Sequence, residues 1–248
     1  SRQLEALIAQ LNQIRSDPIS ELGLATLSQI MASRHSIAIA QAARLVGEFE
    51  IRALMPNLVS AFDRLMVKAK DRDPGCRGKA AIADSLYRLE YADETLFLQG
   101  IRHVQWEPTW GAQVDTAPQL RGLCALGLVR MNYGNALIEL ADLLADPEIE
   151  ARIGAARAIA YSENPFGVAL LRLRIKVGDT PTVLGECMAA LLQLSVPDTL
   201  PLAATLLHAG TKESDPREAI ERAEVIALVL GESRLPAALP VLQTWWQT

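Results

Sequence analysis

The sequence predicts an all-α protein that folds as an α-α superhelix of about six helical-hairpin repeats. Hydrophobic residues make up 50% of the 248 residues and aromatic residues only 5%. The apolar side chains are therefore mainly Ala, Leu, Ile and Val, a mixture typical of closely packed helices. They recur at helical spacing, as in Leu137, Leu140, Ala141 and Leu144. A short motif that contains a pair of small residues also recurs along the chain, and this repetition predicts a solenoid.

Prolines indicate where helices begin. Asp or Thr directly precedes Pro at several sites, and this pair places an N-cap acceptor before a residue whose φ already suits the first helical turn. Segment 170–177 alternates apolar and basic residues, but we predict a helix there because a lone strand would have no partner for its backbone. The expected helix starts are Asp17-Pro18, Asp73-Pro74, Asp146-Pro147, Thr180-Pro181 and Asp215-Pro216.

The repeated motif is clearest in Asp146–Ala160 and Asp73–Leu86, where Arg is followed after two residues by Ala-Ala. Gln119–Val129 repeats it without the Asp-Pro start. Small pairs let the second helices of neighbouring repeats approach closely, whereas Leu or Phe would hold them apart. Weaker copies are Ile39–Gly47, Leu184–Leu192 and Glu221–Leu230.

The spacing of the copies agrees with two short helices per repeat. Alignment on Ala43, Ala81, Ala125, Ala156, Met188 and Val225 gives steps of about 38, 44, 31, 32 and 37 residues, a range typical of helical hairpins. We therefore expect one repeat domain over residues 1–248, with an inserted loop at about 103–117.

These copies resemble the HEAT-repeat superfamily, an armadillo-like group, and especially the short bacterial repeats of phycobilin-attaching lyases. In that superfamily Asp and Arg commonly form a ladder that runs from repeat to repeat. The resemblance implies a ladder of Asp73, Arg77, Arg121, Asp146 and Arg152 here, interrupted in later copies where Leu184 and Glu221 replace the Arg. The residues that carry the resemblance are Asp146, Pro147, Arg152, Ala155, Ala156 and Ile159, and Asp73, Pro74, Arg77, Ala80, Ala81 and Leu86.

The charge argues against nucleic acid as a partner. The formal charge is -5 with a pI near 5.3, whereas nonspecific affinity for phosphates comes mainly from dense Lys and Arg. One basic cluster is interrupted by Asp71 and Asp73, and we interpret it as a solvated turn. Its members are Arg64, Lys68, Lys70, Arg72, Arg77 and Lys79.

No pattern of catalytic or metal-binding residues is present in the sequence. His35, His103 and His208 lack metal-ligand spacing, and the His-Glu pairs of HEAT-repeat hydroxylases are absent. No P-loop, dinucleotide fingerprint or nucleophile elbow occurs. Cys124 and Cys187 lie in small-residue stretches, where a thiol acts as apolar filler. We therefore expect no catalytic residue, no metal and no cofactor.

The sequence also predicts a compartment. Cys76, Cys124 and Cys187 are odd in number and far apart, which favours a reducing environment. No stretch approaches the roughly 20 apolar residues of a membrane span, and no signal peptide pattern opens the chain. We expect a soluble cytoplasmic protein without membrane insertion.

Two sets of residues are candidates for binding a partner. Trp106 and Trp110 lie in the inserted loop, where they either form a recognition site or fold back over a gap between repeats, and folding back is favoured. Trp245 and Trp246 are interpreted as a cap on the last repeat, with self-association through an exposed pair as the alternative. The polar candidates on the second helices are Arg77, Arg121, Glu150, Arg152 and Arg157.

In this interpretation the shape of the predicted superhelix indicates the function of the protein. The curved surface of such a superhelix suits a non-catalytic scaffold or adaptor that binds a protein partner through its concave side. Two alternatives remain open: a bilin lyase or lyase-like subunit, which the resemblance allows, and a nucleic-acid-processing HEAT protein. Visible absorption after mixing with bilin would favour the first alternative, and salt-sensitive retention on DNA would favour the second.

Overall fold

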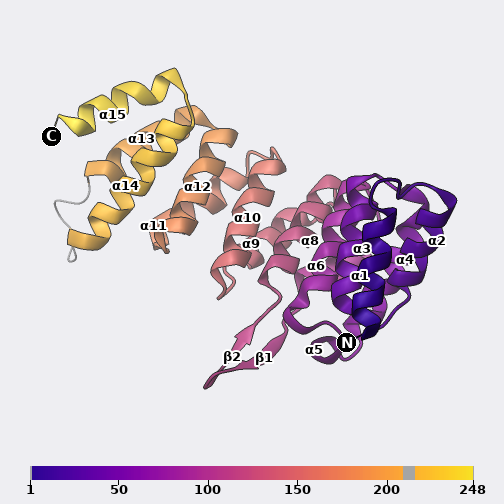
Figure 1. Ribbon diagram of the computed structural model, residues 1–248. Coiled ribbons are helices and arrows are strands. Elements are labelled where there is room, and N and C mark those ends of the chain that lie inside the picture. Colours follow the sequence, from indigo (N-terminus) through magenta and orange to yellow (C-terminus); the bar gives the residue numbers. More distant parts are fainter. Residues whose placement is uncertain (1, 209–215, 248) are drawn as a thin grey trace. The chain divides into compact units, whose positions relative to one another are not determined.

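The computed structural model describes residues 2–208 and 216–247, and in these residues the protein is mostly helical (Figure 1). This confirms the all-α class. The chain divides into two compact units, residues 1–136 and 137–248. The expected single domain over 1–248 stays a prediction, and each unit is described by itself. Asp215 lies outside the described residues.

The first unit consists of helices and one β-hairpin. Its elements are α1 (Arg2–Ile14), α2 (Glu21–Met31), α3 (Ser36–Glu48), the short 3-10 turn η1 (Arg52–Leu54), α4 (Met55–Met66), α5 (Ala69–Arg72), η2 (Pro74–Cys76), α6 (Arg77–Arg88), α7 (Glu94–Ile101), β1 (Trp106–Thr109), β2 (Ala112–Asp115) and α8 (Pro118–Arg130).

In this unit α6 packs against both α3 and α8, so that the second helices of three successive pairs form a row. The helices α2, α4 and α7 pack against this row and supply larger side chains to the core. Phe62 of α4 and Phe97 of α7 are fully buried. Small residues of the row, such as Ala43 and Ala83, are also fully buried, in agreement with the predicted role of small pairs in close helix packing.

The contact between α3 and α6 is close at Gly47. A Cβ atom at this position would lie 2.9 Å from Ser85 Oγ and 3.1 Å from Ser85 Cα. Ser85 Oγ lies 2.7 Å from the Ala43 carbonyl oxygen and 2.8 Å from the Ala81 carbonyl oxygen, and its hydroxyl group donates to them. Because Ala43 belongs to α3 and Ala81 to α6, Ser85 joins the two helices where Gly47 makes room for it.

The second unit repeats the helical pattern. Its elements are α9 (Ala136–Leu144), which begins at the boundary, α10 (Ile149–Tyr161), α11 (Gly167–Val177), α12 (Pro181–Leu194), α13 (Val196–His208), α14 (Pro216–Glu232), the 3-10 turn η4 (Pro236–Ala238) and α15 (Leu239–Trp246).

Here α12 packs against α10 and α14, while α11 and α13 pack against α12. The core contains Ile159 of α10, Met188 and Leu191 of α12 and Ile226 of α14, all nearly inaccessible to solvent. Burial of such side chains stabilises the unit by about 1.5–3 kcal/mol each.

The helical predictions agree with the structure in type and differ at the ends. All six residues used to align the repeats lie in helices, and segment 170–177 is helical in α11. At three Asp-Pro sites the α-helix begins two or three residues after the proline, at Glu21, Arg77 and Ile149. The prolines there occupy the turn that leads into the helix. At Thr180-Pro181 the helix begins at the proline itself.

The sequence interpretation found no strands, and this was wrong for the inserted loop. Segments 106–109 and 112–115 form an antiparallel hairpin, the only sheet in the described residues. Each strand has only four residues and Pro108 interrupts the first, so the alternation is too short to be recognised in the sequence. Gly111 closes the turn with a φ of +82°, which glycine adopts without strain.

Replacement of Gly47 by Val tests the close approach of α3 and α6. The added side chain overlaps Ser85, and we expect a loss of about 1–3 kcal/mol in the free energy of unfolding, measured by urea denaturation. Gly134→Ala is the control, because a Cβ at Gly134 would meet nothing within 4 Å, and its effect should stay within about 0.5 kcal/mol. Equal effects of the two changes would contradict this packing.

Candidate functional site

The β-hairpin is the most distinctive surface feature of the first unit. Figure 1 shows β1 and β2 extending away from the helices. In the hairpin Trp106 pairs with Asp115 and Thr109 pairs with Ala112, so Trp110 lies at the tip. The exposed fraction is 105% for Trp110 and 51% for Trp106. The favoured expectation that both rings fold back over a gap is therefore wrong.

The base of the hairpin is held by a buried ion pair at the start of α6. Lys79 Nζ lies 3.1 Å from Asp73 Oδ2, and both side chains are completely buried. Asp73 also accepts the backbone N–H groups of Gly78 at 2.8 Å and Lys79 at 2.9 Å. The carboxylate thus caps the first turn of α6 and neutralises the lysine, as a buried charge requires.

Gln105 connects this ion pair to the hairpin. Its Oε1 accepts from Lys79 Nζ at 2.9 Å, and its Nε2 donates to the Asp73 carbonyl oxygen at 2.9 Å. The same Nε2 donates to Glu107 Oε1 at 2.6 Å. Gln105 is buried, so its amide has a fixed orientation and the first residues of the hairpin are tied to α6.

Glu107 and Asp115 anchor the two strands. Glu107 Oε1 also accepts the Gly75 N–H at 2.7 Å and the Thr116 hydroxyl at 2.8 Å. Asp115 accepts the backbone N–H of Gln105 at 2.9 Å and the Arg121 guanidinium at 2.6 Å. Arg121 lies in α8, and therefore both ends of the hairpin are bound to the N-terminal turns of second helices.

The same contacts shift the pKa values of the two carboxyl groups. Burial by itself would raise the pKa of Asp115, but the N–H groups of Gln105 and Ala117 and the Arg121 guanidinium outweigh burial and hold it below its ordinary value. Burial likewise opposes the lowered pKa of Glu107, which the donors from Gln105, Gly75 and Thr116 maintain.

His103 lies beside this network in its neutral form at pH 7. Partial burial lowers its pKa, and the charges of Lys79 and Arg121 act in the same direction, against the hydrogen bond to Gln105 and the charge of Asp115. His103 Nε2 is 3.2 Å from Gln105 Oε1. Because this oxygen can only accept, Nε2 carries the proton and Nδ1 is the acceptor.

The arginines predicted as contact residues have different environments. Arg121 is buried against Asp115 and donates to the His103 carbonyl oxygen at 2.9 Å. Arg152 is buried and forms two hydrogen bonds with Asp179, at 2.7 and 2.8 Å. The structure therefore assigns Arg121 and Arg152 to the interior, because their guanidinium groups bind within the protein. Arg77 is exposed on α6.

Glu150 and Arg157 lie on the exposed side of α10. Arg157 forms two hydrogen bonds with Glu186 of α12, at 2.7 and 2.8 Å. This ion pair links two neighbouring second helices at the surface, and exposed pairs of this kind contribute at most about 1 kcal/mol.

The ladder implied by the HEAT resemblance is partly wrong in its residues. Lys79, not Arg77, pairs with Asp73, and Asp115 is the acid that pairs with Arg121. Asp73 and Lys79, like Asp115 and Arg121, are separated by six positions. This spacing does not by itself identify the pairs, because Asp71 and the exposed Arg77 have the same spacing, and the carboxylate partner of Arg152 is Asp179 rather than Asp146.

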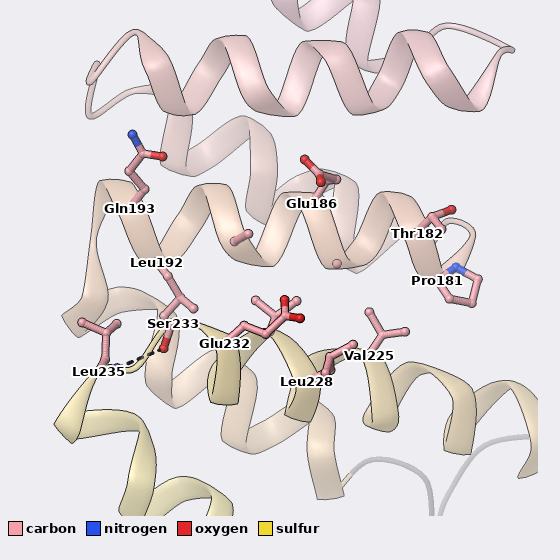
Figure 2. Close-up of a pocket in the computed structure, with 13 residues that line it drawn as sticks. Pro181, Thr182, Glu186, Leu192, Gln193, Val225, Leu228, Glu232, Ser233 and Leu235 are labelled. Atoms are coloured by element: carbon pink, nitrogen blue, oxygen red, sulfur yellow. Dashed lines mark hydrogen bonds between the residues drawn. The ribbon is translucent and has the colours of Figure 1, made fainter.

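A groove lies between α12 and α14 in the second unit (Figure 2). Its volume is about 620 Å³. Val225 and Leu228 of α14 point toward α12, and Glu232 lies at the same side. At Gly185 a Cβ would lie 2.9 Å from Val225 Cγ1, so glycine permits this close approach. The groove is mainly apolar with carboxylates at its rim.

Charge is unevenly distributed between the units. Residues 137–248 contain 9 Lys and Arg against 15 Asp and Glu, whereas residues 1–136 contain 15 against 14. The net negative charge of the protein therefore belongs to the second unit.

The described residues offer little for covalent or metal chemistry. All three cysteines are buried free thiols, and burial raises the pKa of Cys76 and Cys187 to about 12 and that of Cys124 further. They are therefore protonated and poor nucleophiles at pH 7. In this part of the chain no group of three or more His, Cys, Asp or Glu side chains is placed to hold a metal. None of its helices is both long and apolar enough to cross a membrane.

The aromatic pair of α15 is split by its environment. Trp246 is 84% exposed, whereas Trp245 is half-buried. The two rings therefore do not form a fully covered cap, and little of the Trp246 side chain is in contact with the rest of the protein.

Comparisons with protein-family models, curated proteins and solved structures find no match to this chain. The resemblance to HEAT repeats therefore stays a prediction from the sequence.

Lys79→Met tests the buried ion pair. The change keeps the length of the side chain but leaves Asp73 as a buried carboxylate without its cation, and we expect a loss of about 3–5 kcal/mol in the free energy of unfolding. Lys70→Met is the control, because Lys70 is exposed and its loss should cost less than about 0.5 kcal/mol. Urea denaturation of both variants measures the difference, and similar midpoints would refute the role of Lys79.

Acid should release the hairpin. Glu107 and Asp115 have lowered pKa values, so their contribution is complete above the ordinary values of 4.5 and 3.8 and is lost as the pH falls through the lower folded values. Faster amide hydrogen exchange in residues 105–117 below about pH 4, relative to α12, measures this loss. Uniform protection down to pH 2 would contradict it.

His103 adds a step to this profile at higher pH. Its folded pKa is below the ordinary value of 6.5, so stability falls as the pH drops from 6.5 through the folded value. A His103→Gln variant should lack this step and keep the one below about pH 4, which separates the two contributions.

Proposed function

We propose that this protein is a non-catalytic, HEAT-like α-solenoid that binds a protein partner, with the β-hairpin as its main recognition element. The observation that carries the proposal is the complete exposure of Trp110 at the tip of a hairpin whose base is fixed by buried charges. The solenoid arrangement is part of the proposal and is supported by the two rows of packed second helices.

An exposed Trp at a hairpin tip is unfavourably solvated in the free protein and contributes strongly to the binding free energy in a complex. The indole presents a large apolar area with one hydrogen-bond donor, and Trp is enriched among residues that dominate binding energy. Trp106 and Val114 are also substantially exposed, but the strand register places them on opposite faces of the hairpin. Trp110 at the tip is therefore the apolar anchor that the hairpin offers to a partner.

The buried network makes this surface rigid. Lys79, Gln105 and Asp115 hold the two ends of the hairpin to α6 and α8. Binding to a preorganised surface costs less conformational entropy than binding that must first order a flexible loop. The network therefore favours a recognition role for the hairpin over a role as an irregular connection.

The exposed faces of the second helices provide additional contact area. Arg77, Glu150 and Arg157 remain candidates there, since each is exposed. Gln119 and Leu123 of α8 continue such a face beside the hairpin, exposed and half-buried respectively. Many shallow contacts of this kind supplement an aromatic anchor in protein interfaces.

The exposed tip favours a protein over a bilin. A tetrapyrrole requires an enclosing pocket, whereas Trp110 projects freely. The acidic second unit disfavours a polyanion, because nucleic acid binding depends on dense positive charge.

Affinity capture with the immobilised full chain tests the proposal. Proteins retained from a native lysate are identified, and their retention is compared between the wild type and Trp110→Ala. If the tip is a hot spot worth about 2 kcal/mol, affinity falls roughly 30-fold. Direct titration with the purified partner measures this loss.

Two matched variants make the result specific. Trp246→Ala removes another highly exposed indole and should retain the partner. Ala189→Trp fills the groove between α12 and α14 and should also retain it. Unchanged binding by Trp110→Ala would reject the hairpin as the site, and loss of binding in Ala189→Trp would move the site to the groove.

A further inference from the structure

An open pocket of about 420 Å³ lies between α5 and the base of the hairpin, on the side of Trp106. This volume is within the range of pockets that hold small molecules. Apart from two small or apolar residues, its lining is polar or aromatic. The residues concerned are Lys68, Lys70, Asp71, His103, Gln105 and Trp106.

Two lysines give one wall of this pocket a positive charge. Lys68 and Lys70 are exposed, and no carboxylate of the described residues forms an ion pair with either. Two other basic residues of segment 64–72 form hydrogen bonds within the protein. Arg64 donates to the Met31 carbonyl oxygen, and Arg72 donates to the Arg64 carbonyl oxygen at 2.9 Å. The two ammonium groups are therefore the cations available to an anion in the pocket.

The opposite wall is fixed in position and in hydrogen-bonding character. Gln105 Oε1 accepts from both Lys79 and His103 Nε2, so the buried ion pair sets the orientation of the amide and, through it, the tautomer of the imidazole. His103 Nδ1 is then left as an acceptor. It suits a hydroxyl or N–H donor of a ligand.

Trp106 supplies a flat aromatic surface. Half of its side chain is exposed, and its position in β1 is fixed by pairing with Asp115. An indole in this situation stacks well on a planar ring, as aromatic side chains do on bases in nucleic-acid complexes. Asp71 adds an acceptor for hydroxyl or amino groups.

We infer that this pocket binds a phosphorylated nucleoside of mononucleotide size. Lys68 and Lys70 contact the phosphate, Trp106 stacks on the base, and His103 Nδ1 and Asp71 accept hydrogen bonds from hydroxyl or amino groups of the ligand. The two lysines are compact point charges on flexible stems, which suits a terminal phosphate monoester. This inference is independent of partner binding by the hairpin tip, because Trp110 lies outside the pocket lining.

Calorimetric titration of the full chain at low and physiological salt tests the inference, with AMP, UMP, adenosine and inorganic phosphate as probes. We expect saturable binding of AMP or UMP, at least tenfold tighter than that of adenosine or phosphate alone, with affinity that falls as salt rises. Tryptophan fluorescence, quenched on binding, gives a second measure.

Paired variants localise the site. Trp106→Ala, and the double change Lys68→Ser with Lys70→Ser, should each reduce the affinity for AMP at least tenfold. Trp110→Ala, on the same hairpin, and Lys176→Ser, an exposed lysine of α11, should leave it unchanged. Trp106→Ala should also abolish the quenching.

Several results would overturn the inference. These are the absence of AMP and UMP binding at millimolar concentration, equal affinity for phosphate and AMP, or AMP affinity that survives both pocket variants. Binding of an oligoadenylate without binding of AMP would also overturn it, in favour of a nucleic-acid strand.

Discussion

The first unit depends on one buried ion pair, that of Lys79 with Asp73. Two charges without contact with water are stable only when their remaining hydrogen-bonding capacity is met. Backbone N–H groups of α6 satisfy the carboxylate, and Gln105 satisfies the ammonium group. Since Gln105 belongs to the hairpin segment, α6 cannot hold its charges correctly unless the hairpin is in place.

This coupling explains how a short two-stranded hairpin is ordered at all. An isolated hairpin of four-residue strands is marginal in water, and most of this one is exposed. Its order comes from its base, where Glu107 accepts a hydrogen bond from Gly75, just before α6, and Asp115 accepts one from Arg121 of α8. The same anchoring positions Trp110 at the tip, and His103 and Trp106 in the pocket that Lys68 and Lys70 also line.

The second unit uses related chemistry in another way. Asp179 precedes α12 as Asp73 precedes α6, but six residues later the chain has Gly185 and no cation. The carboxylate instead pairs with Arg152 of α10 and Arg174 of α11. Because Gly185 has no side chain, α14 approaches α12 closely there. Asp179 thus links two successive second helices, and Gly185 lines the groove at the point where α14 comes close to α12.

The sequence by itself determined the helical class, the positions of the second helices and the small residues at their contacts, because helical periodicity and side-chain volume are local properties of the chain. It also predicted an inserted loop at about 103–117, where the structure has a β-hairpin. Only the tertiary structure decided that Lys79 rather than Arg77 is the buried cation, that Arg121 and Arg152 are internal and that Trp110 is exposed. Burial and ion pairing join residues tens of positions apart, such as Lys79 with Gln105, so the chain's local pattern does not specify them.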